Sequence, residues 1–182
     1  GPSQHQIFFF DGLAGTGKTF VAEAILSKVR SQGQIAIAVA STSIGALSLT
    51  GGRTLHFRFN LPCDFNETTY ADIRSGSALA QLIEQAKVIV WDVAPMAHRH
   101  VLECIDRTFR NIMRNHQPFG GKKLVLIGDF RQSLPVMPCA TKQEVVSACL
   151  KTSELWHNIK VYHLTINERA KQNQFFWTRV LH

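Results

Sequence analysis

The segment Gly12-Leu-Ala-Gly-Thr-Gly-Lys-Thr19 constrains the fold of this chain more than any other. It follows an apolar run, Ile7–Phe10, and it leads into a helix-like stretch, Lys18–Ser31. A glycine-rich loop between a strand and a helix is typical of a P-loop, in which backbone N–H groups and the helix N-terminus surround the phosphates of a nucleotide. In that motif Lys18 contacts the β- and γ-phosphates and Thr19 contacts Mg²⁺. The sequence therefore predicts a nucleoside triphosphate site after the first strand.

Short apolar runs alternate with amphipathic stretches along the whole chain. This pattern predicts an α/β fold, with a parallel sheet that has helices on both faces. Strands are expected at Ile7–Phe10, Ile35–Ala40, Val88–Trp91, Leu124–Ile127 and Val161–Leu164. Helices are expected at Lys18–Ser31, near Ile44–Leu49, at Ser77–Gln85 and at His98–Asn115.

Two of these helices carry apolar residues at helical spacing. Phe20, Ala24 and Ile25 are expected on one side of the first helix. The apolar face of the longest helix is expected to carry Val101, Leu102, Ile105, Phe109 and Ile112.

The composition fits one intracellular domain. The chain has 182 residues, of which 45% are hydrophobic, enough for one ordinary core. A net charge of +7 fits a polyanionic partner such as nucleic acid. The cysteines are widely spaced and form no C-x-x-C pair, so reduced thiols are expected. No apolar run reaches membrane-spanning length and no signal peptide is visible, so we expect no membrane partner.

Polar residues follow each expected strand. In an open parallel sheet, ligands gather at the carboxyl ends of the strands. The residues expected there are the P-loop, Ser41-Thr42-Ser43, Asp92, the segment Gly128–Gln132 and the segment Thr165–Arg169. Their common position predicts one functional edge of the sheet.

Two aspartates compete for the metal position, because Asp92 and Asp129 each end an apolar strand. Such a carboxylate holds Mg²⁺ through water in P-loop enzymes. Arg131 and Gln132 follow Asp129 closely, and this donor pair suits a γ-phosphate sensor better than a metal ligand. We therefore assign Asp92 to the metal. Each aspartate also has a purely structural interpretation, as a helix N-cap.

Four segments together resemble helicase motifs I, II, III and IV. They are Asp11–Thr19, Trp91-Asp-Val-Ala-Pro-Met96, Gly128-Asp-Phe-Arg-Gln-Ser-Leu-Pro-Val136 and Leu164-Thr-Ile-Asn-Glu-Arg169. The resemblance is to the Pif-type (petite integration frequency) DNA helicases of superfamily 1B, and within them to the branch found in Helitron-like transposons. It implies a RecA-like P-loop NTPase domain that binds ATP and Mg²⁺. It also implies tracking along single-stranded DNA in the 5′-to-3′ direction.

The resemblance also implies roles for individual residues. Those around the nucleotide would be Gly12, Ala14, Gly15, Thr16, Gly17, Lys18, Thr19 and Phe20. The catalytic set would be Lys18, Asp92, the sensor Gln132 and Arg169, with Thr19 and Asp92 on the metal. The DNA-facing residues would be Ser41, Thr42, Ser43, Arg53, Thr54 and His56, which fix the backbone position without reading sequence.

Two interpretations stay open near the second DNA-facing block. Phe57 and Phe59 flank Arg58, a pattern that suits either stacking on DNA bases or packing in the core. His56 is either a structural histidine or a DNA contact.

The sequence departs from the family pattern at Val93, where the family has the glutamate that activates the attacking water. Valine cannot act as a base, so hydrolysis is expected to fall by about 10²–10⁴-fold while Mg-ATP binding survives. Smaller departures are Ser133 and the run Ser43-Ile-Gly45, where Gly-Ile-Ala is usual. The alternative function is a pseudo-helicase, a nucleotide-, DNA- or protein-binding module without turnover.

We expect three segments along the chain. Residues 1–6 comprise a tag remnant, seen in Gly1-Pro2-Ser3, and a flexible N-terminus. Residues 7–170 form the first motor domain, and residues 171–182 begin the connection to a second motor domain that this sequence does not include. The isolated domain is expected to be a monomer, with a protein partner as a further expectation. In a eukaryote the resemblance implies a nuclear or mitochondrial location.

Overall fold

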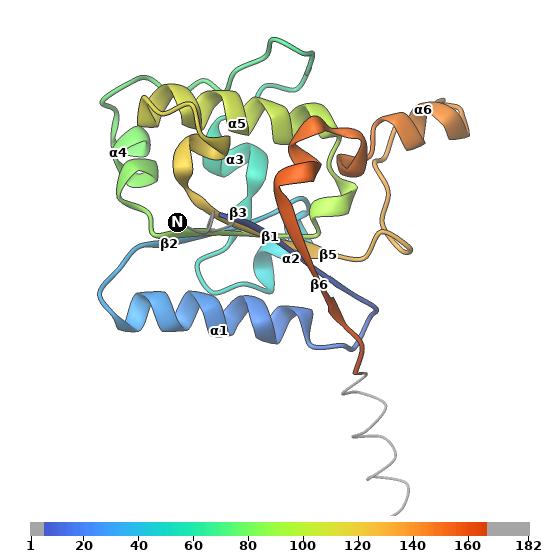
Figure 1. Cartoon of the computed structure of the whole chain (residues 1–182), viewed down its shortest axis with the longest axis horizontal. Helices are drawn as coiled ribbons and strands as arrows, with labels where there is room; N and C mark the ends of the chain where they lie inside the picture. Colours follow the sequence, from blue (N-terminus) through green and yellow to red (C-terminus); the bar gives the residue numbers. More distant parts are fainter. Residues whose placement is uncertain (1–5, 167–182) are drawn as a thin grey trace, which may run out of the picture.

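The computed structural model describes residues 6–166, which form an α/β domain around one sheet (Figure 1). The strands are β1 Ile7–Gly12, β2 Ala36–Ala40, β3 Arg53–Thr54, β4 Val88–Asp92, β5 Lys123–Gly128 and β6 Ile159–Leu164. The α-helices are α1 Lys18–Ser31, α2 Ser43–Leu47, α3 Leu55–Phe59, α4 Ala78–Gln85, α5 Arg99–Met113 and α6 Lys142–Ser147. Short 3₁₀ turns occur at η1 Ala94–Met96, η2 Pro118–Gly121, η3 Leu150–Thr152 and η4 Glu154–Asn158.

The sheet has the strand order β3-β2-β4-β5-β1-β6, and every neighbouring pair is parallel. β1 therefore lies between β5 and β6, and Asp11 is level with Gly128 on one side and His163 on the other. Because all strands run the same way, the loops after β1, β4 and β5 leave the same edge of the sheet. The strand ends that the sequence assigned to one functional edge therefore do lie at one edge of the sheet.

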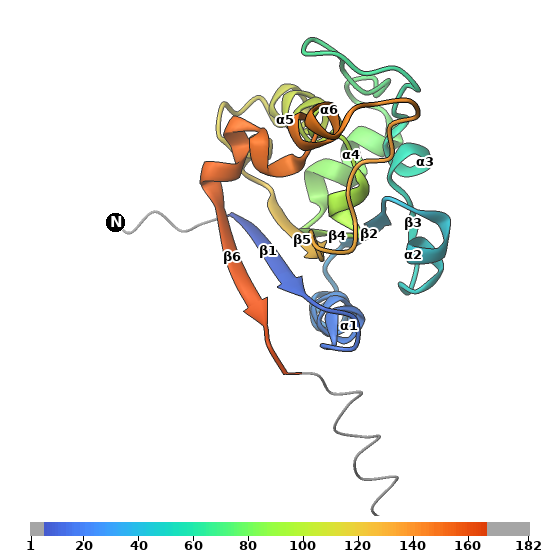
Figure 2. The same ribbon diagram turned by 90° about the vertical axis from the view of Figure 1, so that its right-hand side faces the viewer.

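Helices cover both faces of the sheet, as predicted (Figures 1 and 2). Helix α1 lies on one face, and α3, α4 and α5 lie on the other. Successive residues of a strand point to opposite faces, so each strand contributes side chains to the hydrophobic core on either face of the sheet. Val88 and Val90 of β4 pack with Leu26 of α1, whereas Ile89 and Trp91 join the larger cluster beneath α5.

The predicted helices and strands are all present, with ends that shift by one or two residues. Ser77 is the cap of α4 and not its first residue, because its hydroxyl accepts a hydrogen bond from the Ala80 N–H at 3.2 Å. His98 likewise precedes α5 as its cap. β3 was not predicted, because a strand of two residues has no detectable period, and the short helices α3 and α6 were not predicted either.

The apolar faces were predicted with mixed success. All five expected residues of α5 are buried, which confirms that face. The face expected on α1 is wrong, because Phe20 is 77% exposed and Ala24 is exposed as well. The side chains that α1 buries are Ala22 and Leu26, and Ile25 packs only partly against them. None of the helices in residues 6–166 is both long enough and apolar enough to cross a bilayer.

Candidate nucleotide site

The loop between β1 and α1 has the backbone geometry of a phosphate-binding loop. Gly15 and Gly17 have φ angles of +84° and +87°, a region that side chains rarely adopt. The Thr16 hydroxyl donates to the Leu13 carbonyl at 2.7 Å and closes the loop on itself. A Cβ at Gly12 would overlap Thr16, so this position also requires glycine. The glycines therefore shape the loop that leads into the N-terminus of α1.

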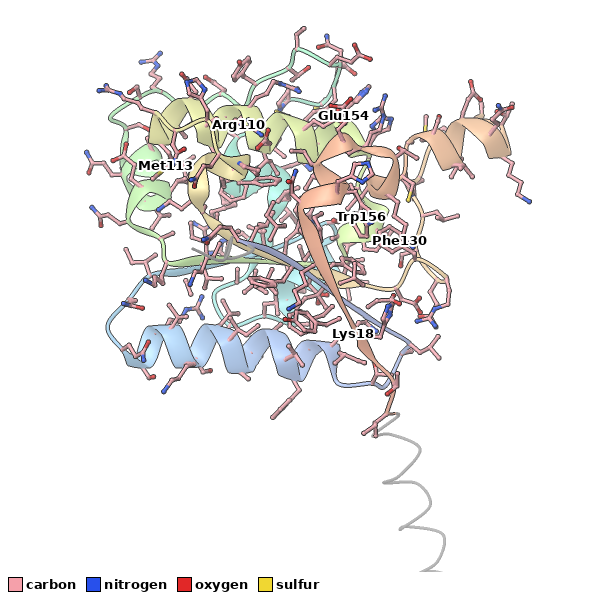
Figure 3. The ribbon with its side chains drawn as sticks, viewed as in Figure 1. Lys18, Arg110, Met113, Phe130, Glu154 and Trp156 are labelled. Atoms are coloured by element: carbon pink, nitrogen blue, oxygen red, sulfur yellow. The ribbon has the colours of Figure 1, made fainter. Side chains whose placement is uncertain are left out.

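Lys18 lies at the start of α1, at the helix end nearest the carboxyl end of β1 (Figure 3). Its ammonium group donates to the carbonyls of Gly12 at 2.8 Å and Leu13 at 2.9 Å. These two bonds hold a positive charge across the loop, beside the unpaired N–H groups of the first helical turn. The combination is a site for a polyanion such as a chain of phosphates.

A cavity of about 710 Å³ joins this loop to α2 and to the end of β4. Its lining includes most residues that the sequence predicted for the nucleotide. The residues that line it are Ala14, Gly15, Gly17, Lys18, Thr19, Phe20, Thr42, Ile44, Gly45, Ser48, Asp92 and Val93. The fold therefore brings Asp92 to the same cavity as Lys18 and Thr19, which lie more than 70 residues earlier in the sequence.

Asp92 has the surroundings of a cation ligand. The residue is buried, and its Oδ1 accepts a hydrogen bond from the Val93 N–H at 2.8 Å. Burial raises the pKa of Asp92, while the Val93 hydrogen bond and the charge of Lys18 oppose that rise. A carboxylate and the Thr19 hydroxyl on one cavity wall are oxygen donors of the kind that Mg²⁺ prefers. The residues present thus fit a magnesium ion.

Asp129 is placed differently, outside the lining of the cavity. Its Oδ1 accepts hydrogen bonds from the Arg131 backbone N–H at 3.0 Å and from the Arg131 Nε at 2.8 Å. Burial alone would raise the pKa of Asp129, but the hydrogen bonds and charge of Arg131, with the charge of Lys18, hold it below its usual value. Asp129 therefore caps its own turn, and the cavity favours Asp92 as the metal-side carboxylate.

The loop after β5 carries the predicted sensor. Gln132 is exposed and its N–H donates to the Asp129 carbonyl at 3.2 Å, but its side chain does not line the cavity. Phe130 anchors this loop against Trp156, with ring centroids 5.4 Å apart (Figure 3). The other predicted phosphate contact, Arg169, lies outside the described residues.

Val93 adopts an unusual backbone conformation at the cavity wall. Its φ and ψ angles are 55° and 32°, the left-handed region, which is a genuine outlier for a β-branched residue. The N–H bond to Asp92 and a hydrogen bond from the Met96 N–H to the Val93 carbonyl at 3.2 Å hold this turn. This backbone conformation places Val93 in the cavity wall, directly after Asp92.

The residues predicted to face DNA divide into two groups. Ser41 accepts a hydrogen bond from the Trp91 indole at 2.8 Å, and Thr42 caps α2 and lines the nucleotide cavity, whereas Ser43 is exposed. Arg53 is exposed and Thr54 caps α3. Ser41 and Thr42 therefore also stabilise the fold through these hydrogen bonds.

The second DNA-facing block lies at β3 and α3, at the far edge of the sheet from β6. His56 is exposed and its ring meets Phe65 edge-on at 5.7 Å. Phe59 is buried and packs on Phe109, so it belongs to the core, whereas Phe57 is 71% exposed. Only Phe57 retains the surface needed for stacking.

The sequence did not predict three residues that line the cavity, Ile44, Gly45 and Ser48. They follow Thr42, which was predicted to face DNA and which also lines this cavity. The order of strands in the sheet would have revealed them, because β2 and β4 are neighbours and their following loops must meet.

The parallel sheet, the P-loop after β1 and the buried aspartate at the end of a neighbouring strand define a P-loop NTPase with a RecA-like fold. The profile of the PIF1-like helicase family matches residues 2–178, and the chain belongs to that family. It is 35% identical over 153 residues to the ATP-dependent DNA helicase RRM3 of Saccharomyces cerevisiae, covering 81% of this chain and 21% of that protein.

Solved structures agree with this assignment. Bacteroides Pif1 bound to single-stranded DNA superimposes with a TM-score of 0.74 and 27% identity, over 90% of this chain and 39% of that one. The Bacteroides Pif1 complex with ADP-AlF3 and single-stranded DNA matches with a TM-score of 0.74 and 26% identity, again over 90% and 39%. The chain thus spans about a fifth of the length of its curated relative RRM3 and two fifths of these solved chains.

Proposed function

We propose that residues 7–170 are the first motor domain of an ATP-dependent DNA helicase, with residues 171–182 leading to the second. In this proposal the domain binds Mg-ATP, and its hydrolysis is reduced because Val93 replaces the glutamate. The observation that carries the proposal is the cavity in which Lys18, Thr19 and Asp92 meet. Its support outside this chain is the Bacteroides Pif1 complex, which contains ADP-AlF3 and single-stranded DNA.

The residues of the chain divide the binding work. The loop N–H groups and the start of α1 face the phosphates, and Lys18 exchanges its bonds to Gly12 and Leu13 for phosphate oxygens. Thr19 and Asp92 would hold Mg²⁺, which neutralises the charge that develops on the phosphates. Gln132 and Arg169 are proposed to approach the γ-phosphate.

Hydrolysis requires a base that orients and deprotonates water, and the cavity wall offers a valine methyl group at that position. Removal of a positioned base costs about 10²–10⁴-fold in rate. Asp92 does not replace it, because its carboxylate is committed to the Val93 N–H and to the cation side of the cavity. The protein should therefore bind Mg-ATP but hydrolyse it slowly.

The proposed DNA path runs over the carboxyl edge of the sheet, past Ser43, Arg53 and His56, all of which are exposed. The strand polarity is proposed to be 5′-to-3′, as the resemblance implies. Because the charge of the chain is +7, we expect sequence-independent binding that weakens with salt. In a eukaryote such a protein would act where DNA is kept, in the nucleus or the mitochondrion.

The test is equilibrium binding of a fluorescent ATP analogue with Mg²⁺, followed by single-turnover hydrolysis. Lys18→Ala should weaken binding at least tenfold, while substitution of the exposed Lys28 in the last turns of α1, Lys28→Ala, should leave it unchanged. Val93→Glu should raise the hydrolysis rate by about 10²-fold or more. Equal affinities of wild type and Lys18→Ala would overturn the proposed site.

A second candidate function is a pseudo-helicase that binds nucleotide without using it. The observation that favours it is the left-handed valine on the cavity wall, since strained backbone persists where the surroundings fix it. The test measures ATP hydrolysis by Val93→Glu with the remaining motor domain attached. A rate that single-stranded DNA does not raise would favour this candidate over the motor.

A further inference from the structure

The side chain of Val93 lies close to Gly45 in the neighbouring helix α2. A Cβ placed on Gly45, in α2, would lie 2.8 Å from the Val93 Cγ2 atom, closer than real Cβ atoms come to a carbon. The same Cβ would lie 3.0 Å from the Thr42 Oγ1 and 3.1 Å from the Ala40 Cβ. The valine methyl group therefore occupies the room that a side chain at position 45 would need.

Neither partner can move easily. Valine is stiff at χ1 because it is branched at Cβ. Its backbone is held by the Asp92 carboxylate and by the turn η1, where Pro95 packs against the end of β5 at Gly128. On the other side, the Thr42 cap fixes the start of α2. The contact between positions 45 and 93 is thus made by two rigid elements across the cavity wall.

The resemblance seen in the sequence implies alanine at 45 and glutamate at 93, and this chain has glycine and valine there. Gly45 lies inside a helix with an ordinary negative φ, where alanine is normally the better residue. Glycine therefore has no backbone reason to be there. The reason is steric: the Val93 methyl group is the nearest obstacle, followed by the Thr42 hydroxyl and the Ala40 Cβ.

We propose that Gly45 is a second determinant of hydrolysis, and that Gly45 and Val93 form a matched pair that closes the cavity wall with apolar atoms. This inference rests on the proposed nucleotide site. With the pair in place, the protein retains its triphosphate at a wall that holds no base. In Val93→Glu alone, the space beside Gly45 stays free of a side chain. The Cγ of the glutamate then occupies that space, as the Val93 methyl group does now. An alanine at 45 directs that side chain back to the cavity.

The first test is a double-mutant cycle on thermal stability, which needs no activity. Gly45→Ala should lower the Tm by about 5 °C, against the usual gain for alanine in a helix. In the Val93→Ala background the same change should lower the Tm by less than half as much. Gly33→Ala is the control. At a φ of +70° it strains its own backbone, but its Cβ would meet nothing within 4 Å, so any loss of stability should be the same in both backgrounds.

The second test is single-turnover hydrolysis of ATP with Mg²⁺. The double variant Val93→Glu with Gly45→Ala should exceed Val93→Glu alone by at least about tenfold. Gly45→Ala alone should give no gain, because it supplies no base. Equal rates in the single and double glutamate variants would overturn the role of Gly45 in hydrolysis.

The outcomes separate this inference from the proposed function. Additive Tm changes for Gly45→Ala and Val93→Ala would overturn the matched pair, whatever the nucleotide affinity. If Gly45→Ala fails to fold but the double alanine variant folds, the pair is supported; if neither folds, it is overturned. A different result would separate the two claims the other way. If Lys18→Ala does not weaken binding, while the Tm changes of Gly45→Ala and Val93→Ala are not additive, the nucleotide site is overturned and the packing pair stands.

Discussion

Removal of the Ser41 hydroxyl should destabilise the sheet, because this group is the partner of a buried indole. Trp91 is fully buried, and its Nε1 donates to the Ser41 Oγ at 2.8 Å. Ser41→Ala leaves that N–H without a partner, which costs about 1–3 kcal/mol. For a protein of this size the Tm should fall by roughly 2–4 °C for each kcal/mol, and thus by about 5 °C.

Thermal and urea unfolding, followed by circular dichroism, measure this effect. Ser43→Ala is the matched control: Ser43 is exposed, and its substitution should change stability by less than about 0.5 kcal/mol. Ser41→Thr keeps the oxygen and should recover part of the loss. If Ser41→Ala is as stable as Ser43→Ala, the hydrogen bond to Trp91 contributes nothing and the reasoning is wrong.

Two further predictions concern the end of β5. Gly128→Ala would place a methyl group against the Pro95 ring, so it should destabilise the fold by about 1–3 kcal/mol. It should also weaken Mg-nucleotide binding, because the turn after Asp92 would move. In urea unfolding, adding Pro95→Ala to this variant should recover much of the lost stability. Asp129→Asn should cost about 1 kcal/mol at pH 7. Because the folded-state pKa of Asp129 is depressed, that difference should persist above pH about 4 and shrink as the pH falls through the folded value; a difference independent of pH in urea unfolding would contradict this assignment.

The sequence predicted the fold class and most elements because their signals are local. The P-loop glycines fix a strand, a turn and a helix together, and α1 indeed spans Lys18–Ser31. The face of α1 could not be read in the same way. Phe20 looks like a core residue by hydropathy, yet it lies at the rim of the nucleotide cavity and 77% of it is exposed.

Two features of the site depend on strand order, which composition and periodicity do not give. β2 lies beside β4, and this adjacency places Ser41 under the Trp91 indole and Gly45 against Val93. Sequence alone singled out Val93 as a departure from the pattern that the resemblance implies. It could not show that a glycine 48 positions earlier shapes the same wall.

The two margins of the sheet differ in how readily they could accept a foreign chain. At one margin β3 offers two residues, too few for a stable ladder. At the other, β6 offers six residues that pair only with β1 within residues 6–166, and it exposes Lys160 and His163. A charged outer strand of this kind resists addition of a further strand. Should concentrated solutions of this protein self-associate through backbone pairing, growth would begin at β6, and neutral residues in place of those basic ones would hasten it.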